Sequence, residues 1–286
     1  MMLGELLKHG ESTLVEAGIE DWKTDAWYLL QYICRMDRSA YFLHQRDEVD
    51  EKICMQYEQV LARRAEHVPL QHITGTQDFM GLSFFVNEHV LIPRQDTEVL
   101  VETCMGFLRE GDRVLDMCTG SGCIIISLVT LCHDIIGTGV DISLEALQVA
   151  RKNARDLGTD ITFVQSNLFE DMPEQSKYDM IVSNPPYIRT EVIGTLMEEV
   201  RCHEPVLALD GTEDGLFFYR EIIKQACSYL QHGGRLCFEI GHDQAEDVKA
   251  LMEKAGYEKI EVKKDLAGLD RVVTGCYMEG KRCLTN

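Results

Sequence analysis

The chain carries the stretch Arg113-Val114-Leu115-Asp116-Met117-Cys118-Thr119-Gly120-Ser121-Gly122, in which an apolar strand pattern runs into a glycine-rich turn. The helical run 123–132 follows at once. Such a turn lets a ligand approach the backbone, and the free N–H groups of the following helix can bind a carboxylate or a phosphate. The stretch therefore predicts the first strand–loop–helix unit of a ligand-binding α/β sheet.

An acidic residue narrows the kind of ligand. Asp141 ends the next apolar segment, about twenty residues after the glycine turn, where an acidic side chain can hold ribose hydroxyls. The dinucleotide pattern Gly-x-Gly-x-x-Gly and the Walker-type Gly-Lys-Ser/Thr are both absent from the turn, because position 118 is Cys and position 125 is Ile. We therefore expect an adenosine with an amino-acid tail. Glycines that merely permit a tight turn are the alternative, which Asp141 disfavours.

Outward from the turn, short apolar segments alternate with amphipathic ones. Helices fit residues 143–157 and 215–230. This alternation is typical of a doubly wound α/β sheet with helices on both faces. The last two strands lie too close in sequence for a crossover helix, so we expect the last one to be antiparallel. The expected strands are 113–117, 136–141, 161–165, 180–183, 235–240, 259–263 and 271–278.

The first part of the chain has a different pattern. Helices fit residues 6–17, 24–34 and 50–66, where apolar side chains recur at helical spacing. From residue 71 on, β-branched and aromatic residues flank Gly81, which is typical of a hairpin, and Pro93 ends it before a helix over 96–109. We therefore expect a helical domain over 1–70, a β-hairpin linker over 71–92 and a cofactor-binding domain over 93–286.

A second motif, Asn184-Pro185-Pro186-Tyr187, follows an apolar strand. Ligands of open α/β sheets bind at the carboxyl ends of strands, so Asn184 should lie near the glycine turn if its strand neighbours the first one. Both prolines fix φ and have no N–H, which leaves their carbonyls as acceptors. Asn184 adds a side-chain carbonyl, and Tyr187 adds a flat ring face.

These groups match a planar –NH2 target. The Asn184 side-chain oxygen and the Pro185 carbonyl can accept its two hydrogens, while its plane lies on Tyr187. The nitrogen lone pair then faces an electrophilic methyl group, a reaction that needs orientation and no strong base. Asn-Pro-Pro as a mere strand terminator is the alternative, which the glycine turn in the same sheet disfavours. The motif alone does not choose between a glutamine amide and an adenine amine.

Composition restricts the partners. The 286 residues carry a formal net charge of -20, which repels phosphate backbones, so we expect no direct nucleic-acid contact. The 11 cysteines form no Cys-x-x-Cys pair, and the nine histidines show no metal-ligand spacing, so we expect reduced thiols and no metal site. The apolar run 123–132 is too short to cross a bilayer, and no signal peptide is evident. A cytoplasmic protein without membrane contact is expected.

The chain resembles the glutamine N5-methyltransferases that modify peptide-chain release factors, the HemK family. The resemblance implies a class I methyltransferase fold, S-adenosylmethionine as the cofactor, and the glutamine of a release factor's Gly-Gly-Gln loop as the substrate. It also implies that the helical domain helps to dock that factor. Besides the two motifs above, it rests on the segments 69–75, 90–98, 204–205, 208–209, 214–216, 239–241 and 265–271.

The resemblance also implies the roles of single residues. Asn184 and Pro185 would be catalytic, and Asn184, Pro185, Pro186 and Tyr187 would hold the glutamine amide. Cys118 departs from the family, which usually has Gly there, so a positive φ at Cys118 would be strained. The cofactor would be lined by Arg94, Thr97, Asp116, Cys118, Thr119, Gly120, Ser121, Gly122, Asp141, Leu168 and Asn184.

Three alternatives stay open at this point. A ribosomal-protein glutamine would require the same site chemistry. A DNA adenine N6-methyltransferase would also present a planar –NH2 group, although the acidic charge and the absence of a recognisable DNA-binding insert count against it. A cofactor-binding scaffold without activity is disfavoured by the intact Asn184 and Tyr187.

Overall fold

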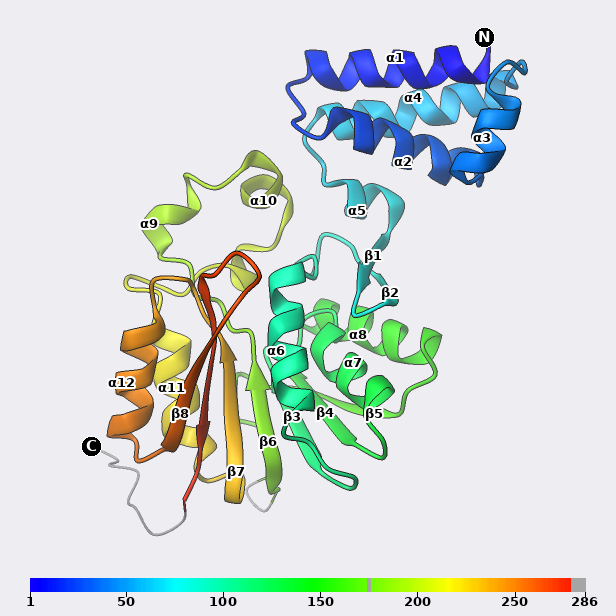
Figure 1. The fold of residues 1–286 in the computed structure, drawn as a ribbon. Coiled ribbons are helices and arrows are strands. Elements are labelled where there is room, and N and C mark those ends of the chain that lie inside the picture. Colours follow the sequence, from blue (N-terminus) through cyan, green and yellow to red (C-terminus); the bar gives the residue numbers. More distant parts are fainter. Residues whose placement is uncertain (174–175, 279–286) are drawn as a thin grey trace. The chain divides into compact units, whose positions relative to one another are not determined.

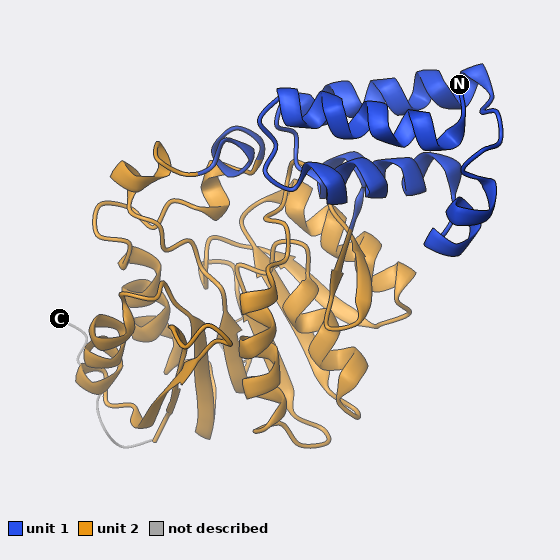
Figure 2. Cartoon of the chain, turned by 45° about the horizontal axis from the view of Figure 1, so that its top comes forward, with its two compact units in different colours: residues 1–76, 197–203 blue, residues 77–196, 204–286 orange. Residues whose placement is uncertain are grey.

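The computed structural model describes residues 1–173 and 176–278, which fold into two compact units. The first unit comprises residues 1–76 together with 197–203, and the second comprises 77–196 and the chain from 204 onward (Figure 2). The boundary after Thr76 lies close to the expected end of the helical region. The return of 197–203 to the first unit has no counterpart among the sequence expectations.

The first unit is built from short amphipathic helices around one apolar core (Figure 1). Its largest fully buried side chains include Leu6, Leu30, Tyr57 and Leu61. Asp37 caps one helix that the sequence did not suggest, by accepting from the Ala40 N–H at 2.8 Å. The helices are α1 (Leu3–Glu16), α2 (Trp22–Cys34), α3 (Arg38–His44), α4 (Glu51–Ala65), α5 (Leu70–Thr74) and α10 (Glu198–His203).

A buried arginine holds the returning segment in this unit. Arg64 on α4 is 3% exposed and donates to Asp25 on α2 at 2.6 Å. Its guanidinium also pairs with Glu199 of α10. His203, at the end of α10, is hydrogen-bonded to the Glu66 carbonyl at 3.2 Å. Because these partners satisfy a buried charge, the segment 197–203 packs with helices that precede it by more than a hundred residues.

The expected hairpin over 71–92 is wrong in extent. Residues 70–74 form α5 instead of a strand, because Pro69 precedes the helix and Gly75, at φ 74°, ends it. The hairpin is confined to β1 (Thr76–Phe79) and β2 (Leu82–Phe85), joined at Met80 and Gly81, both with positive φ. From residue 86 to the start of the next helix the chain has no regular structure.

The second unit contains a seven-stranded sheet in the order β5-β4-β3-β6-β7-β9-β8. All pairs from β5 to β7 are parallel. The last strand, β9, lies between β7 and β8 and is antiparallel to both, which confirms the expectation. The strands are β3 (Arg113–Met117), β4 (Ile136–Asp141), β5 (Ile161–Gln165), β6 (Tyr178–Ser183), β7 (Leu230–Glu239), β8 (Glu258–Lys264) and β9 (Asp270–Cys276).

Helices cover both faces of the sheet (Figure 1). Alternate strand residues serve the two sides: Val114 packs in one core cluster and Leu115 in the other. One face carries α6 (Gln95–Met105), α7 (Cys123–Leu131) and α8 (Leu144–Asp156), and the other carries α11 (Phe217–Ala226) and α12 (Ala245–Lys254). The expected helix over 215–230 ends early, because Leu230 already pairs in β7. No described helix is both long and apolar enough to cross a membrane.

The two sequence motifs meet at one edge of this sheet. Because β3 and β6 are parallel neighbours, the glycine turn and the Asn-Pro-Pro-Tyr loop leave the sheet side by side. The Ser183 hydroxyl at the end of β6 donates to the Met117 carbonyl at the end of β3, at 2.6 Å. Short helical turns, α9 (Thr190–Ile193) and η1 (Val206–Ala208), follow in the segment after β6.

Candidate active site

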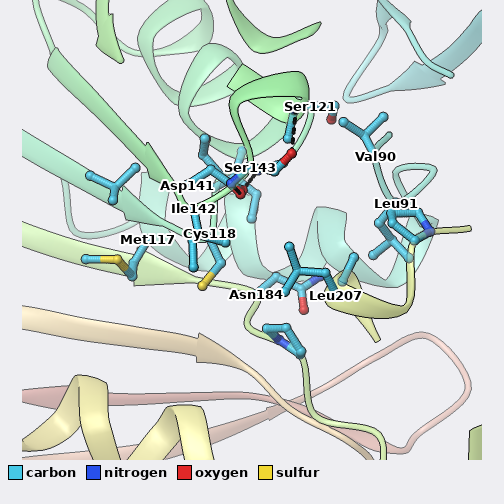
Figure 3. A pocket seen from close by; sticks show the side chains of 18 of the residues that line it. Val90, Leu91, Met117, Cys118, Ser121, Asp141, Ile142, Ser143, Asn184 and Leu207 are labelled. Atoms are coloured by element: carbon cyan, nitrogen blue, oxygen red, sulfur yellow. Dashed lines mark hydrogen bonds between the residues drawn. The ribbon is translucent and has the colours of Figure 1, made fainter. Parts of the chain in front are cut away.

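A cavity of about 250 Å³ lies at the carboxyl ends of the strands, within the second unit. Figure 3 shows Ser121, Asp141 and Asn184, which follow or end three neighbouring strands, gathered around it. Of the residues expected from the sequence, the cavity is lined by Arg94, Thr97, Cys118, Thr119, Gly120, Ser121, Asp141, Leu168, Asn184 and Pro186.

Local backbone bonds shape the glycine loop. The Thr119 N–H donates to the Val140 carbonyl at 2.9 Å, and the Gly122 N–H donates to the Thr119 carbonyl at 2.8 Å. Gly120 has φ 55°, and a Cβ placed there would meet no atom within 4 Å. Gly122 lies outside the lining, has φ 80°, and a Cβ there would lie 2.8 Å from Ile126 Cδ1. Gly122 therefore permits tight packing of the loop on α7, while Gly120 leaves open space for a ligand.

Asp141 connects the glycine loop to the next strand. Its Oδ2 accepts from the Gly120 N–H at 2.8 Å, and its Oδ1 accepts from the Ser143 N–H at 2.9 Å. Burial raises the pKa of this carboxyl, and these backbone donors partly offset the effect. Each oxygen still has a lone pair in addition to the one used, so the carboxylate can accept from hydroxyl groups in the cavity.

Asp116, on β3, supports the glycine loop through a hydrogen bond to Thr119. It is fully buried, lies outside the cavity lining, and accepts from the Thr119 hydroxyl at 2.6 Å. Burial raises the pKa of Asp116 to about 7, although the Thr119 hydrogen bond acts in the opposite direction. The structure thus places Asp116 as a support for the cavity-lining Thr119 and gives it no direct place on the cavity surface.

Two lining residues other than glycine have a left-handed backbone. Cys118 has φ 62°, as the comparison with the family's usual glycine suggested, and Leu168 has φ 52°. Backbone strain of this kind persists where the surrounding structure enforces it and is common at binding sites. Burial also raises the pKa of the Cys118 thiol, which keeps it protonated.

Asn184 has one orientation, which its neighbours fix. Its Nδ2 donates to the Thr97 hydroxyl oxygen at 3.3 Å. Burial raises the pKa of the neighbouring Glu239 carboxyl, and the nearby Thr97 hydroxyl acts in the opposite direction. The Asn184 amide hydrogen therefore points at Thr97, which leaves Oδ1 as the acceptor available to the cavity.

Of the rest of the motif, only one residue lines the cavity. Pro185 is buried, and neither Pro185 nor Tyr187 belongs to the cavity lining, whereas Pro186 does. The Tyr187 hydroxyl donates to Glu239 Oε1 at 3.2 Å. Burial and the neighbouring Glu239 raise the pKa of Tyr187, so it stays a neutral donor. Its ring is therefore fixed at one end.

The structure adds residues that sequence reasoning did not assign. Glu204, 5% exposed, pairs with the Arg94 guanidinium and accepts from the Ile92 N–H at 3.3 Å. This joins two irregular segments that border the cavity. The family-like segments 90–98 and 204–205 pointed to this region without indicating the ion pair. The other lining residues without an assigned role include Val90, Leu91, Met117, Ile142, Leu207, Phe217 and Phe218.

Comparisons with known proteins identify the family of the chain. The model of the PrmC N-terminal domain matches residues 5–75, and a methyltransferase domain model matches residues 108–274. The release factor glutamine methyltransferase of Clostridium acetobutylicum is 37% identical over 278 residues, which cover 96% of this chain and 98% of that protein. The enzyme of the same name from Geobacter sulfurreducens is 40% identical over 262 residues, 92% of each chain.

Solved structures show the same fold. A methyltransferase from Pyrococcus furiosus superimposes with a TM-score of 0.55 at 18% identity, covering 76% of this chain and 98% of that chain. At this identity the similarity concerns the fold, while the sequence relatives define the family. The chain is a methyltransferase and belongs to the release factor glutamine methyltransferase family.

Proposed function

We propose that the protein transfers the methyl group of S-adenosylmethionine to the side-chain amide nitrogen of the glutamine in the Gly-Gly-Gln loop of a peptide-chain release factor. The observation that carries this proposal is the fixed orientation of Asn184, whose Nδ2 is bonded to Thr97 and whose Oδ1 is left for a hydrogen of a planar amide. The names of the full-length relatives support the choice of glutamine over adenine.

The cavity fits this cofactor. Asp141 has lone pairs for ribose hydroxyls, and Gly120 leaves room for close approach of a ligand to the loop. The apolar side chains of Ile142 and Leu168 suit a flat base. The N-terminus of α7, directly after the loop, favours the carboxylate of an amino-acid tail. When bound, S-adenosylmethionine supplies an electrophilic methyl group on a sulfonium.

The protein's part in the reaction is orientation. In the proposed complex, Asn184 Oδ1 and the Pro185 carbonyl accept the two amide hydrogens, which turns the nitrogen lone pair toward the cavity. Acceptors at these two positions favour a tetrahedral nitrogen as the new bond forms, so they stabilise the transition state more than the ground state. A strong base is unnecessary, because the methylated nitrogen loses a proton readily. No residue of the site is therefore assigned as a base.

The first unit is proposed to help dock the release factor. Apolar side chains lie exposed on α2 and α3: Tyr28 is 49% exposed, Tyr32 is 46%, Phe42 is 61% and Leu43 is 80%. Exposed apolar side chains on two consecutive helices offer contact area for a protein partner. We propose further that the protein acts in the cytoplasm, without contact to a membrane and without direct contact to nucleic acid.

Mass spectrometry of a release factor, before and after incubation with the protein and S-adenosylmethionine, tests the proposal. We expect one added methyl group on the glutamine of the Gly-Gly-Gln peptide. A release factor with that glutamine replaced by alanine serves as the control and should gain no methyl group. Transfer only to a ribosomal-protein glutamine, or only to adenine in duplex DNA, would overturn the proposed substrate and leave the methyltransferase assignment intact.

A further inference from the structure

A buried side-chain amide lies directly behind the Asn-Pro-Pro-Tyr loop. Gln244, at the N-cap of α12, is 5% exposed. Its Nε2 donates to the backbone carbonyls of Tyr187, at 3.0 Å, and Gly215, at 3.2 Å. Its Oε1 accepts from the Gly241 N–H at 2.9 Å. The Tyr219 hydroxyl lies 3.4 Å from Oε1 and donates over a shorter distance, 2.9 Å, to the Glu239 carbonyl. Since both amide hydrogens are donated to carbonyls and the amide oxygen accepts from a backbone N–H, this side chain has a single orientation.

The segment that contains Gly211 and Gly215 packs directly against the backbone of Tyr187. A Cβ at Gly211 would lie 2.7 Å from Tyr187 Cα, and one at Gly215 would lie 2.4 Å from the Tyr187 carbonyl oxygen. The Gly211 N–H donates to the Ile188 carbonyl at 2.8 Å, which continues the contact along the chain. Gln244 therefore holds a place where two backbones meet with no side chain between them.

We propose that Gln244 is a positioning residue for methyl transfer, an inference that rests on the proposed function. It lines no part of the cavity, and it acts through the backbone of Tyr187. Pro185 and Pro186 transmit the constraint, because their rings lock φ and leave little freedom between Tyr187 and Asn184. Holding the Tyr187 carbonyl thus restricts the directions open to the Pro185 carbonyl, the proposed acceptor for a hydrogen of the target amide.

A second buried amide provides a matched control on the cofactor side. Asn153 on α8 is 1% exposed, and its Nδ2 donates to the Ser121 carbonyl at 2.9 Å and to the Phe85 carbonyl at 3.0 Å. Its Oδ1 accepts from the Phe85 N–H at 2.8 Å. Asn153 holds the glycine loop in the way that Gln244 holds the Asn-Pro-Pro-Tyr loop. Loss of the Gln244 amide should therefore lower kcat, whereas loss of the Asn153 amide should raise the Kd of S-adenosylmethionine.

The experiment compares Gln244→Met and Asn153→Leu, which keep the approximate size of each side chain and remove its hydrogen bonds. For Gln244→Met, we expect kcat to fall about 100-fold, because a displacement of about 1 Å at the reacting groups costs that much, while the Kd of S-adenosylmethionine stays within twofold. For Asn153→Leu, we expect that Kd to rise about tenfold, since the Ser121 carbonyl of the glycine loop loses its donor. Calorimetry and methyl-transfer kinetics measure both.

The variant Gln244→Glu tests the donor role of the amide separately from its acceptor role. A carboxylate keeps the acceptor for the Gly241 N–H but cannot donate to the Tyr187 and Gly215 carbonyls while it is ionised. We expect its kcat to fall as far as that of Gln244→Met. A kcat close to that of the wild type in either variant, or equal losses of cofactor affinity for the Gln244 and Asn153 variants, would overturn the positioning role.

Amide hydrogen exchange tests the structural role of Gln244 without a measurement of activity. In Gln244→Met we expect at least tenfold faster exchange at the N–H groups of Ile188 and Gly211, with unchanged exchange at β3. Unchanged exchange around Tyr187 would refute the inference. A wild-type protein that transfers no methyl group to glutamine, with the exchange result as expected, would count against the proposed function and leave the structural role of Gln244 standing.

Discussion

At the scale of single residues, Asn184 shows how a common side chain acquires one chemical role. An asparagine amide can present either its oxygen or its nitrogen to a cavity. Here Nδ2 donates to the Thr97 hydroxyl oxygen at 3.3 Å. This hydrogen bond leaves the side-chain oxygen of Asn184 as the acceptor in the cavity. The sequence motif identified the residue, and its neighbours determine which atom it offers.

Replacing Asn184 by Ala should abolish most turnover. Removing one preorganised hydrogen-bond partner of a transition state costs about 100- to 1000-fold in kcat, and the Kd of S-adenosylmethionine should change only a few-fold. Thr97→Val, which leaves Asn184 free to rotate, should lose about tenfold. Steady-state methyl-transfer kinetics and calorimetry check both variants. An Asn184→Ala protein with full activity would refute the acceptor role.

Cys118 allows a test of backbone strain. At φ 62° a β-branched residue is strained more than a cysteine, and a glycine is not strained. We expect Cys118→Val to lower the free energy of unfolding by about 2 kcal/mol. Cys118→Gly should stay within about 1 kcal/mol of the wild type, because relief of strain offsets the lost packing. Urea unfolding measures the order, and a Val variant as stable as the Gly variant would contradict it.

At the scale of elements, the ends of β3, β4 and β6 supply the three sides of the site. β3 leads into the glycine loop, β4 ends at Asp141, and β6 ends next to Asn184. Each element alone would be an ordinary apolar strand. Their parallel pairing places the polar ends at one edge, and the Ser183–Met117 hydrogen bond holds two of these ends together.

The buried end of β3 should make stability depend on pH. The pKa of Asp116 is raised to about 7 by burial, above its ordinary value of 3.8, so the folded state resists ionisation. The free energy of unfolding should therefore fall as the pH rises from about 4 to about 7, by an amount on the order of 2–4 kcal/mol, and stay level above that. Below pH 4 the carboxyl is protonated in both states and contributes no loss.

Asp116→Asn is the variant that isolates this effect, because it removes the ionisation and keeps an acceptor for Thr119. Unfolding in urea at several pH values should show the variant gaining stability relative to the wild type between pH 4 and 7. Parallel pH curves for the two proteins would show that the Asp116 carboxyl ionises as easily in the folded state as in the unfolded chain.

At the scale of the whole molecule, the chain leaves its second unit and returns to the first for residues 197–203. The buried charge of Arg64 explains this path, since Asp25 and Glu199 both pair with it. The pKa of Asp25 is raised by burial and lowered again by Arg64, so that carboxylate depends on its partner. A segment that follows the Asn-Pro-Pro-Tyr motif in the sequence thus packs in the first unit.

Arg64→Met should therefore destabilise the first unit. Removing one partner of a buried ion pair leaves an uncompensated charge and costs about 3–5 kcal/mol. We expect faster hydrogen exchange in α2, α4 and residues 197–203, with unchanged exchange in β3. The double variant Arg64→Met/Asp25→Leu should recover part of the loss. If the single variant exchanges like the wild type, Arg64 does not hold the segment.

The sequence by itself determined the local features of this protein. Strands 113–117, 136–141 and 161–165 were expected at their observed residues, and the antiparallel last strand followed from a short connection. The two motifs followed from residue types, because glycine and proline constrain their own backbones wherever they occur. The expected hairpin over 71–92 was too long, since apolar composition there did not distinguish a one-turn helix and an irregular segment from strands.

Only the tertiary structure decided which atoms the site presents. The orientation of Asn184, the support of Thr119 by Asp116, the pairing of Arg94 with Glu204 and the hold of Gln244 on Tyr187 all join residues through space. In three of these pairs, Arg94–Glu204, Asn184–Thr97 and Gln244–Tyr187, the two residues lie more than fifty positions apart in the sequence. Hydrogen bonds and buried ion pairs depend on distance and direction in space, and sequence spacing contains neither for residues on different elements. The sequence thus specified the chemistry available, and the fold selected the groups that use it.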